Sequence, residues 1–372
     1  MRKIMQNAIS PLSIIAALAA GTAFVATAAR AAESGSACTT PAEDSADAAA
    51  CKLAGMLERM FIYPETGARY AAVLREGVAQ GRYVGPDREA AARAMTRDLQ
   101  ATSPDGHLRV FVPKEQPPAP AAQPRPDPAP DFPIIEQPGW IAPGIAYIRF
   151  NEFPYDPAVT QQANDFMAQH ATARALIFDI RTHHGGGVEQ MDAILPWLFA
   201  KPTRLLTMET SQATEDEFGS PVAGLASMRV IPDKTMARRE HWVTPNDRTA
   251  LRGAKVYLLT GPRTASAAEH FALAMKATHR ATLVGEPTAG ANHFGGQVDL
   301  PGGLVAFLPV GRTYDPATGK DWEGDGVAPD VAVPKEHALE WVLKDLGIDA
   351  AKARALSATH APTLPMERRK RS

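Results

Sequence analysis

Ser266 stands between two small residues in the segment TASAAE (264–269), directly after the apolar run KVYLLT (255–260). The run predicts a buried strand, and the residues after it predict a helix that begins at the serine. A side chain at a helix N-terminus faces unpaired backbone N–H groups and the positive end of the helix dipole. The serine is therefore either a nucleophile, whose oxyanion those donors would stabilise, or a helix N-cap, for which serine is a preferred residue.

A second candidate site follows another buried strand. The segment ALIFDIRTHHGGG (175–187) predicts a strand that ends in three glycines, and VEQMDAILPWLFA after it predicts a helix. Glycines at such a point allow close backbone approach and can direct N–H groups toward an anion. The spacing fits neither the dinucleotide-binding pattern nor the phosphate-binding loop. We therefore expect Gly185 or Gly186 to donate a hydrogen bond to an oxyanion.

Four segments together resemble the C-terminal-processing (tail-specific) serine peptidases. They occur in the family's order and are DGHL (105–108), ALIFDIRTHHGGG, GPRTASAAEHFALAMKATHRATLVGEPTAGA (261–291) and WEGDGVAPDVAV (322–333). The resemblance is closer to the branch that contains the tricorn core and the interphotoreceptor-retinoid-binding-protein-like peptidases. It implies a crotonase/ClpP-like α/β core, a small helical N-terminal domain, and hydrolysis of peptide bonds through an acyl-enzyme without a cofactor.

The resemblance gives roles to three side chains. Ser266 matches the nucleophile of the family, and His107 in DGHL matches the histidine base of the tricorn-like branch. Glu323, three residues before the glycine of GVAPD, matches the glutamate that orients this base. An imidazole can accept the serine proton near neutral pH, and a carboxylate on its other nitrogen fixes the tautomer. The backbone N–H of Ala267 is expected to hold the oxyanion together with the glycine loop.

The chain departs from the family's patterns at several positions. Ala291 stands where the processing peptidases have a lysine base, so a Ser–Lys dyad is not expected. Gly106 stands where the tricorn-like branch has a helper serine before its histidine. His183, followed by His184, stands where family members often have asparagine. Adjacent histidines lack the spacing of a zinc site, so no metal is expected.

Two other histidines compete with His107 for the role of the base. His270 follows Ser266 by one helical turn on the same face and could reach the hydroxyl locally. His293 lies close to the position of the missing lysine. Glu323 could also be a solvated surface acid. The sequence favours His107 and Glu323 but leaves these alternatives open.

Periodicity divides the chain into units. Three early segments space their apolar residues at three and four, which predicts a helical domain over 38–112. Residues 113–133 hold nine prolines in 21 positions, so we predict a linker over 113–137 that contains no PDZ domain. From 138 to 350, short buried strands alternate with helices, which predicts an α/β core with parallel strand pairs. Residues 351–372 are expected to form a basic C-terminal tail.

The N-terminus has the features of a secretory signal peptide. Residues 1–31 join a basic start to an alanine-rich apolar run and a small-residue cleavage site. Cys38 and Cys51 are the two cysteines of the chain, and in an oxidising compartment we expect them to form a disulfide. Free thiols and a lipid-modified Cys38 are the alternatives. These features predict a periplasmic or extracellular protein with no membrane span once the leader is removed.

Charge narrows the class of partner. The chain has a formal net charge of −2, and removal of the leader makes it more acidic because the leader has basic residues but no acids. An acidic protein gives no reason to expect nucleic acid. We therefore expect a peptide or unfolded protein as the substrate. The alternative is a weak or inactive peptidase that binds apolar ligands on the same fold.

Overall fold

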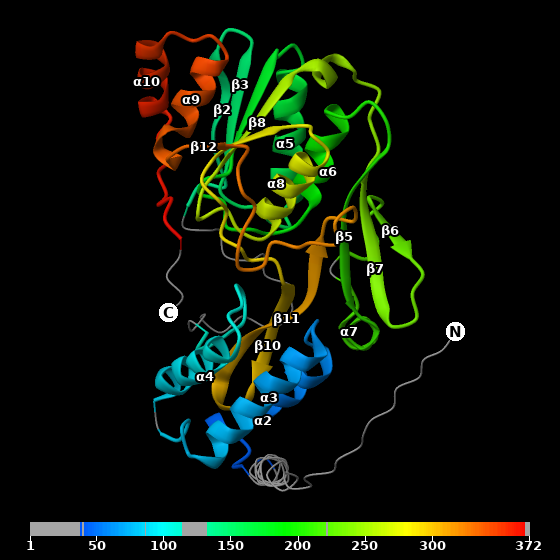
Figure 1. The fold of residues 1–372 in the computed structure, drawn as a ribbon, viewed down its shortest axis with the longest axis vertical. Helices are drawn as coiled ribbons and strands as arrows, with labels where there is room; N and C mark the ends of the chain where they lie inside the picture. The colour runs from blue at the N-terminus through cyan, green and yellow to red at the C-terminus, as the bar shows by residue number, and fades with distance from the viewer. Residues whose placement is uncertain (1–37, 39–40, 86, 114–131, 221, 369–372) are drawn as a thin grey trace, which may run out of the picture.

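The structure is a computed structural model that describes residue 38 and residues 41–85, 87–113, 132–220 and 222–368. These residues form a mixed α/β fold with an upper and a lower lobe (Figure 1). The leader and most of the proline-rich segment lie outside the described residues, so the signal peptide and the expected lack of a PDZ domain stay predictions. Within the described ranges, no helix is both long enough and apolar enough to cross a membrane.

The upper lobe is built on a six-stranded sheet with the order β12–β9–β8–β4–β3–β2. Its strands are β2 (Ile135–Ala142), β3 (Ile145–Phe150), β4 (Ala175–Asp179), β8 (Lys255–Thr260), β9 (Thr282–Gly285) and β12 (Val331–Ala332). All neighbours pair in parallel except β2, which pairs antiparallel with β3 at one edge. The predicted α/β core with parallel strand pairs is confirmed.

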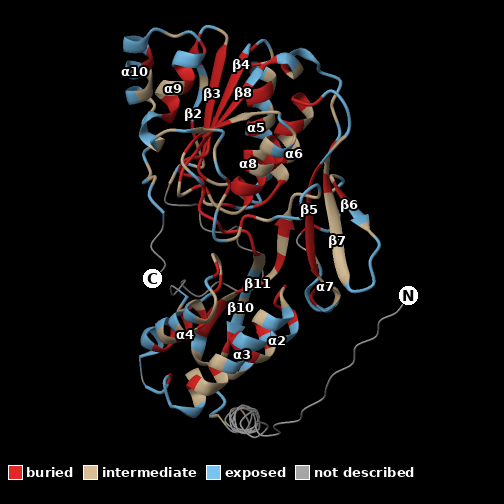
Figure 2. Ribbon diagram, viewed as in Figure 1, coloured by how far each residue is buried: buried red, intermediate tan, exposed pale blue. Residues whose placement is uncertain are grey.

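Helices cover both faces of this sheet (Figure 1). They are α5 (Pro157–Gln169), α6 (Glu189–Ile194) and α8 (Ala267–Ala277) on one face, and α9 (Ala338–Asp345) and α10 (Ala350–Thr359) on the other. β3 contributes Ile148 and Phe150 to the first hydrophobic core and Ile145 and Tyr147 to the second, because successive strand side chains point to opposite faces. Figure 2 shows the resulting burial of the central strands.

The lower lobe combines the N-terminal helices with a strand pair from much later in the chain. Its elements are α2 (Ala46–Met60), α3 (Pro64–Ala79), α4 (Arg88–Thr102), β1 (Arg109–Phe111), β10 (Phe294–Leu300) and β11 (Leu304–Tyr314). Leu53 and Leu99 from the helices share one hydrophobic core with Leu304 and Leu308 from β11. The predicted N-terminal helices are present, but strands from the 138–350 unit complete their core. The predicted domain boundaries stay predictions.

A second sheet, with the order β1–β11–β5–β7–β6 and with β10 also paired to β11, joins the two lobes. Its further strands are β5 (Thr203–Ser211), β6 (Met228–Ile231) and β7 (Met236–Val243), and α7 (Gln212–Phe218) follows β5. β11 pairs with β1 near its start and with β5 near its end. The strand therefore passes from the lower lobe to the upper one (Figure 1).

A disulfide links Cys38 to Cys51 in α2, with Cα atoms 5.6 Å apart. The predicted pairing is confirmed. The bond ties the residue at which the described chain begins to the first helix of the lower lobe.

The chain after residue 350 differs from the expected basic tail. Residues 350–359 form α10, in which Ala353 is fully buried. Beyond this helix, the carbonyl groups of His360 and Ala361 accept hydrogen bonds from the buried guanidinium group of Arg149. A buried arginine has five N–H donors that need acceptors, and this segment supplies some of them. It therefore packs on the core beside β3.

Candidate active site

Ser266 lies in the turn between β8 and α8. Its backbone angles are φ 54° and ψ −119°, a combination that residues other than glycine rarely adopt. An ordinary N-cap residue has an extended backbone instead. A strained strand-to-helix turn that exposes a serine is the arrangement of a nucleophile elbow, and such strain costs about 1–3 kcal/mol. The conformation favours the nucleophile over the N-cap interpretation.

A buried glutamate holds this turn in place. The carboxylate of Glu269 accepts hydrogen bonds from the N–H of Ser266 at 2.8 Å, the hydroxyl of Thr288 at 2.6 Å, and the N–H groups of Gly290 and Ala291 at 2.7 and 2.9 Å. Burial raises the pKa of Glu269 to about 7, although the four hydrogen bonds oppose the shift. The sequence analysis missed Glu269, although Ser-x-x-Glu is the capping-box pattern.

The glycine loop after β4 lies directly beside the serine. A Cβ atom on Gly185 would lie 2.9 Å from Cβ and 3.4 Å from Oγ of Ser266. Gly185 also has a φ of 120°, so both space and conformation require glycine here. Its N–H donates to Nδ1 of His183 at 3.1 Å. Gly186 is exposed and lines the same pocket, so of the two predicted donors it is better placed for an oxyanion.

The ring of His183 fixes the glycine loop by accepting the hydrogen bond from the N–H of Gly185. It is fully buried, and burial lowers the pKa of His183 well below its ordinary value. The ring is therefore neutral, and its Nδ1 atom can accept the hydrogen bond from Gly185. The edge of the ring meets Phe153, with 4.2 Å between ring centroids. His183 thus supports the shape of the glycine loop.

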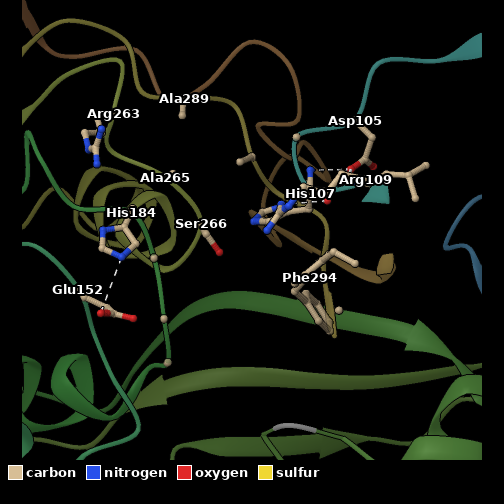
Figure 3. Close-up of a pocket in the computed structure, with 18 of the residues that line it drawn as sticks. Asp105, His107, Arg109, Glu152, His184, Arg263, Ala265, Ser266, Ala289 and Phe294 are labelled. Carbon is tan, nitrogen blue, oxygen red and sulfur yellow. Dashed lines mark hydrogen bonds and ion pairs between the residues drawn. The ribbon is translucent and has the colours of Figure 1, made fainter. Parts of the chain in front are cut away.

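His107 lies across a pocket from Ser266, and the serine hydroxyl points toward its side of the pocket (Figure 3). The pocket has a volume of about 710 Å³, and its lining includes His107, Ser266 and the glycines at 185–187. The ring of His107 stacks on Phe307 of β11, with centroids 5.2 Å apart. The structure therefore brings the predicted base, nucleophile and glycine loop to one place.

The carboxylate of Glu323 accepts a backbone hydrogen bond from the loop that carries His107. Its Oε1 accepts the N–H of Gly106 at 2.6 Å, and its Oε2 accepts those of Asn292 and His293 at 2.6 and 3.2 Å. A Cβ atom on Gly106 would lie 2.8 Å from the Cα atom of Ala291, so a serine there would require the two segments to separate. The backbone of Ala291 therefore occupies the space that a side chain at position 106 would need.

Asp105 is a buried anion in the same loop that the sequence analysis did not assign. Its Oδ1 accepts the N–H groups of His107 and Leu108, both at 2.8 Å, and its Oδ2 lies 2.6 Å from Nδ1 of His293. Burial would raise the pKa of Asp105, but the bond to His293 lowers it below its ordinary value. Burial would lower the pKa of His293, but the bond to Asp105 raises it. The two form a buried ion pair.

The two alternative bases are engaged elsewhere. Nε2 of His270 lies 2.9 Å from Nδ1 of His241, whose Nε2 lies 2.9 Å from a carboxylate oxygen of Asp192. Burial lowers the pKa of His270 well below its ordinary value. Neither His270 nor His293 is among the described residues that line the pocket with Ser266. The arrangement favours the predicted base over both.

A second histidine does line the pocket, on the other side of the serine in the view of Figure 3. Nε2 of His184 lies 3.7 Å from a carboxylate oxygen of Glu152, and its ring meets Phe132 at 5.0 Å between centroids. Arg263 lies beside it in Figure 3. This wall of the pocket is therefore polar and charged.

Comparison with known proteins identifies the family. The model of peptidase family S41 matches residues 144–333, which is more than half of the chain. The chain belongs to peptidase family S41. The peptidase class and the predicted resemblance to the C-terminal-processing peptidases are thereby confirmed. The matched range of this S41 chain includes Ser266, Glu323 and the glycine loop but not His107, so the choice of base depends on the fold.

Individual relatives agree with this assignment. The chloroplastic C-terminal processing peptidase of Tetradesmus obliquus is 28% identical over 218 residues, which is 58% of this chain but only 41% of that protein. The structure of the photosystem II D1 C-terminal processing protease matches 83% of this chain and 99% of its own with a TM-score of 0.52 and 17% identity. The structure of a peptidase from Parabacteroides merdae matches 85% of this chain and 97% of its own, with a TM-score of 0.52 and 16% identity. The two structures share the fold.

Proposed function

We propose that this S41 peptidase is a serine endopeptidase in which Ser266 is the nucleophile and His107 is the base. The single observation that carries the proposal is the strained turn of Ser266, which faces His107 across a pocket walled by the glycine loop. Residues held in sparsely populated backbone conformations cluster at active sites. A serine hydroxyl is a poor nucleophile until a base accepts its proton, and the imidazole across the pocket supplies that base.

The proposed reaction has two halves. Oγ of Ser266 attacks the peptide carbonyl carbon while its proton moves to His107, and the N–H groups of Ala267 and Gly186 stabilise the oxyanion. The C–N bond then breaks, and His107 gives the proton to the leaving amine. A water molecule attacks the acyl-enzyme, His107 takes its proton, and the proton returns to Ser266 as the ester bond breaks. The second product leaves with a new carboxyl terminus.

Glu323 has a different part in this proposal from the one that the resemblance implies. Its carboxylate accepts the N–H of Gly106, which precedes the base. It therefore positions the base through the backbone of the loop.

A labelling experiment tests the proposal. A fluorophosphonate reacts only with an activated hydroxyl, so we expect the full chain to be labelled at Ser266 and to cleave an unfolded protein such as reduced, alkylated lactalbumin. Ser266→Ala is expected to abolish both, and His107→Ala to reduce both by at least about 1,000-fold, as loss of a catalytic group does in serine peptidases. Undiminished cleavage by Ser266→Ala would contradict the proposal. A folded protein that is not labelled but binds apolar ligands would favour the alternative, a binding protein.

We also propose that the protein is exported. The leader-like residues 1–31 and the Cys38–Cys51 disulfide support this location, because disulfides persist in oxidising compartments. N-terminal sequencing of the protein from a bacterial periplasmic fraction is expected to give a chain that begins at Ala32. Recovery of the uncleaved chain with free thiols in the cytosol would contradict export.

A further inference from the structure

A buried cluster joins the loop of the base to the segment beside the nucleophile. Its members are Asp105, His293 and Glu323, whose ligand-type atoms all lie within 4.8 Å of one another. Asp105 and His293 are 2% and 5% exposed. Nδ1 of His293 lies 2.6 Å from Asp105 and 3.9 Å from Glu323. The imidazole therefore stands between the buried carboxylate of Asp105 and the partly buried carboxylate of Glu323.

The cluster completes a chain of contacts from the nucleophile to the base. Glu269 binds the N–H of Ser266 and, on the same carboxylate, the backbone of the segment 288–291. The chain continues to Asn292, whose N–H donates to Glu323, and Glu323 also accepts the N–H of Gly106 in the loop of the base. The next residue, His293, binds Asp105, which accepts the N–H of His107. One short segment is thus fixed at one end to the nucleophile and at the other end to the base.

The distances favour an ion pair over a metal site. Two ligands bound at about 2.0–2.2 Å to a tetrahedral zinc ion lie about 3.3 Å apart, whereas Nδ1 of His293 and Oδ2 of Asp105 are separated by 2.6 Å. The remaining carboxylate oxygens already accept backbone N–H groups. A metal ion would have to displace these hydrogen bonds.

The charges explain why the histidine stands here. A buried carboxylate is costly unless it is paired and hydrogen-bonded, and this cluster contains the buried Asp105 beside the partly buried Glu323. The negative charges of Asp105, Glu323 and Asp321 act on His293, and the guanidinium group of Arg312 lies 3.6 Å from Asp321. The other groups packed on its ring are the aromatic rings of Phe61 and Tyr63. The three carboxylates therefore stabilise a positive imidazolium at this point.

We propose that the ion pair of Asp105 and His293 positions the base: it locks the loop of His107 onto the segment that Glu269 fixes to the nucleophile. The proposal deepens the proposed function and rests on it. Asp105 and His293 are positioning residues, because they act on His107 through its backbone. Asp105 lies between α4 and β1, and His293 directly precedes β10, so the pair links two segments that are far apart in the chain.

The proposal predicts a pH dependence with a definite sign. The pKa of His293 is raised in the folded protein, so the ion pair contributes fully at a pH below the ordinary imidazole value. Its contribution is lost as the pH rises through the raised folded pKa and the imidazolium loses its proton. We therefore expect kcat/KM to decrease on the alkaline side as His293 deprotonates and the loop loosens.

Asp105→Asn is the sharpest variant. Asparagine keeps an oxygen that can accept the N–H groups of His107 and Leu108 but loses the charge that pairs with His293. We expect kcat/KM for the lactalbumin substrate to decrease about 10- to 100-fold, as a misplacement of about 1 Å does. The decrease should lie mainly in kcat, and the alkaline limb should move to lower pH because nothing then raises the pKa of His293 as strongly. Asp165→Asn, on the exposed face of α5, is the matched control.

Direct titration of His293 keeps the proposal testable whatever the variant does. The histidine NMR signals of the inactive Ser266→Ala protein are recorded as the pH is varied, and the signal that His293→Gln removes is assigned to His293. We expect this signal to titrate above the ordinary imidazole pKa. His337→Gln, which removes an exposed histidine, is the control for the assignment. A His293 that titrates at or below that value overturns the proposal. An Asp105→Asn enzyme whose kcat/KM and alkaline limb are unchanged also overturns the proposal. The same holds if the wild-type protein contains one metal ion per chain and Asp105→Asn loses it. A wild-type protein that neither cleaves nor becomes labelled refutes the proposed function, while the titration still decides whether the ion pair forms.

Discussion

The backbone conformation of Ser266 gives information about its role that the residue type alone does not give. Serine before a helix is ordinary, and its sequence context supports capping as well as catalysis. A positive φ at a residue other than glycine is not ordinary, and here four hydrogen bonds to the buried Glu269 hold the segments that maintain it. The strain is stabilised by neighbours that lie about twenty residues later in the chain. The conformation therefore favours the nucleophile interpretation where the residue type does not, although Ser266 also occupies the N-cap position of α8.

Gly106→Ser tests whether the tricorn-like helper serine could be restored. A Cβ atom at Gly106 would lie 2.8 Å from Cα and 2.9 Å from Cβ of Ala291, so the segments must separate and the contact with Glu323 must lengthen. We expect the free energy of unfolding to decrease by about 1–3 kcal/mol, as overpacking typically does, and kcat/KM to decrease as well. Denaturant titration and steady-state kinetics measure these effects. Gly296→Ser, where the new atom meets nothing within 4 Å, is the control, and a more active Gly106→Ser enzyme would contradict the argument.

At the scale of elements, the site forms where two parallel strands end. β4 and β8 are direct neighbours in register, with Asp179 opposite Leu259. Parallel neighbours end at the same edge of a sheet, and α/β proteins place their sites at that edge. The glycine loop after β4 and the serine turn after β8 must therefore meet. This juxtaposition follows from the alternation of strands and helices once the two strands are adjacent.

Gly185→Ala tests the closeness of the two turns. The added methyl group would lie 2.9 Å from Cβ of Ser266 and would require alanine at φ 120°. We expect kcat/KM and the rate of fluorophosphonate labelling to decrease at least about 100-fold, because small displacements of reacting groups have effects of this size. Gly253→Ala, at a position with no atom within 4 Å and no positive φ, should behave like the wild type. Unchanged labelling of Gly185→Ala would mean that the two turns are not in contact in solution.

At the scale of the whole molecule, the proposed catalytic groups come from different lobes. His107 belongs to the lower lobe and Ser266 to the upper one, and β11 passes between the lobes. The ring of His107 stacks on that strand. The position of the proposed base therefore depends on how the two lobes pack.

The segment after α10 is expected to stabilise the upper lobe. Arg149 is fully buried and donates to the carbonyl groups of His360 and Ala361, so truncation after Thr359 leaves buried donors without these acceptors. We expect the free energy of unfolding to decrease by about 1–3 kcal/mol, measured by denaturant titration. Truncation after Pro365 keeps the acceptors and is the matched control. Equal stability of the two truncated proteins would contradict the packing of this segment.

Much of the architecture could be predicted because it depends on local pattern. The strand KVYLLT forms β8 at the predicted residues, and the predicted helices before DGHL form α2, α3 and α4. What pattern could not predict depends on contacts between distant segments. The hydrophobic core that β11 shares with the N-terminal helices and the contacts of His360 and Ala361 with Arg149 belong to this class, because periodicity does not show which distant segments meet.

The sequence by itself determined the family, the segment of the proposed nucleophile, the glycine loop and the pair of cysteines, since each depends on residue types at close spacing. Only the tertiary structure placed His107, rather than His270 or His293, in the pocket with Ser266, and only it revealed the roles of Glu269 and Asp105. Those roles arise from burial and from hydrogen bonds between segments far apart in the chain. When a carboxylate is far from its partners in the sequence, the sequence pattern around it does not show whether folding buries it or leaves it in water.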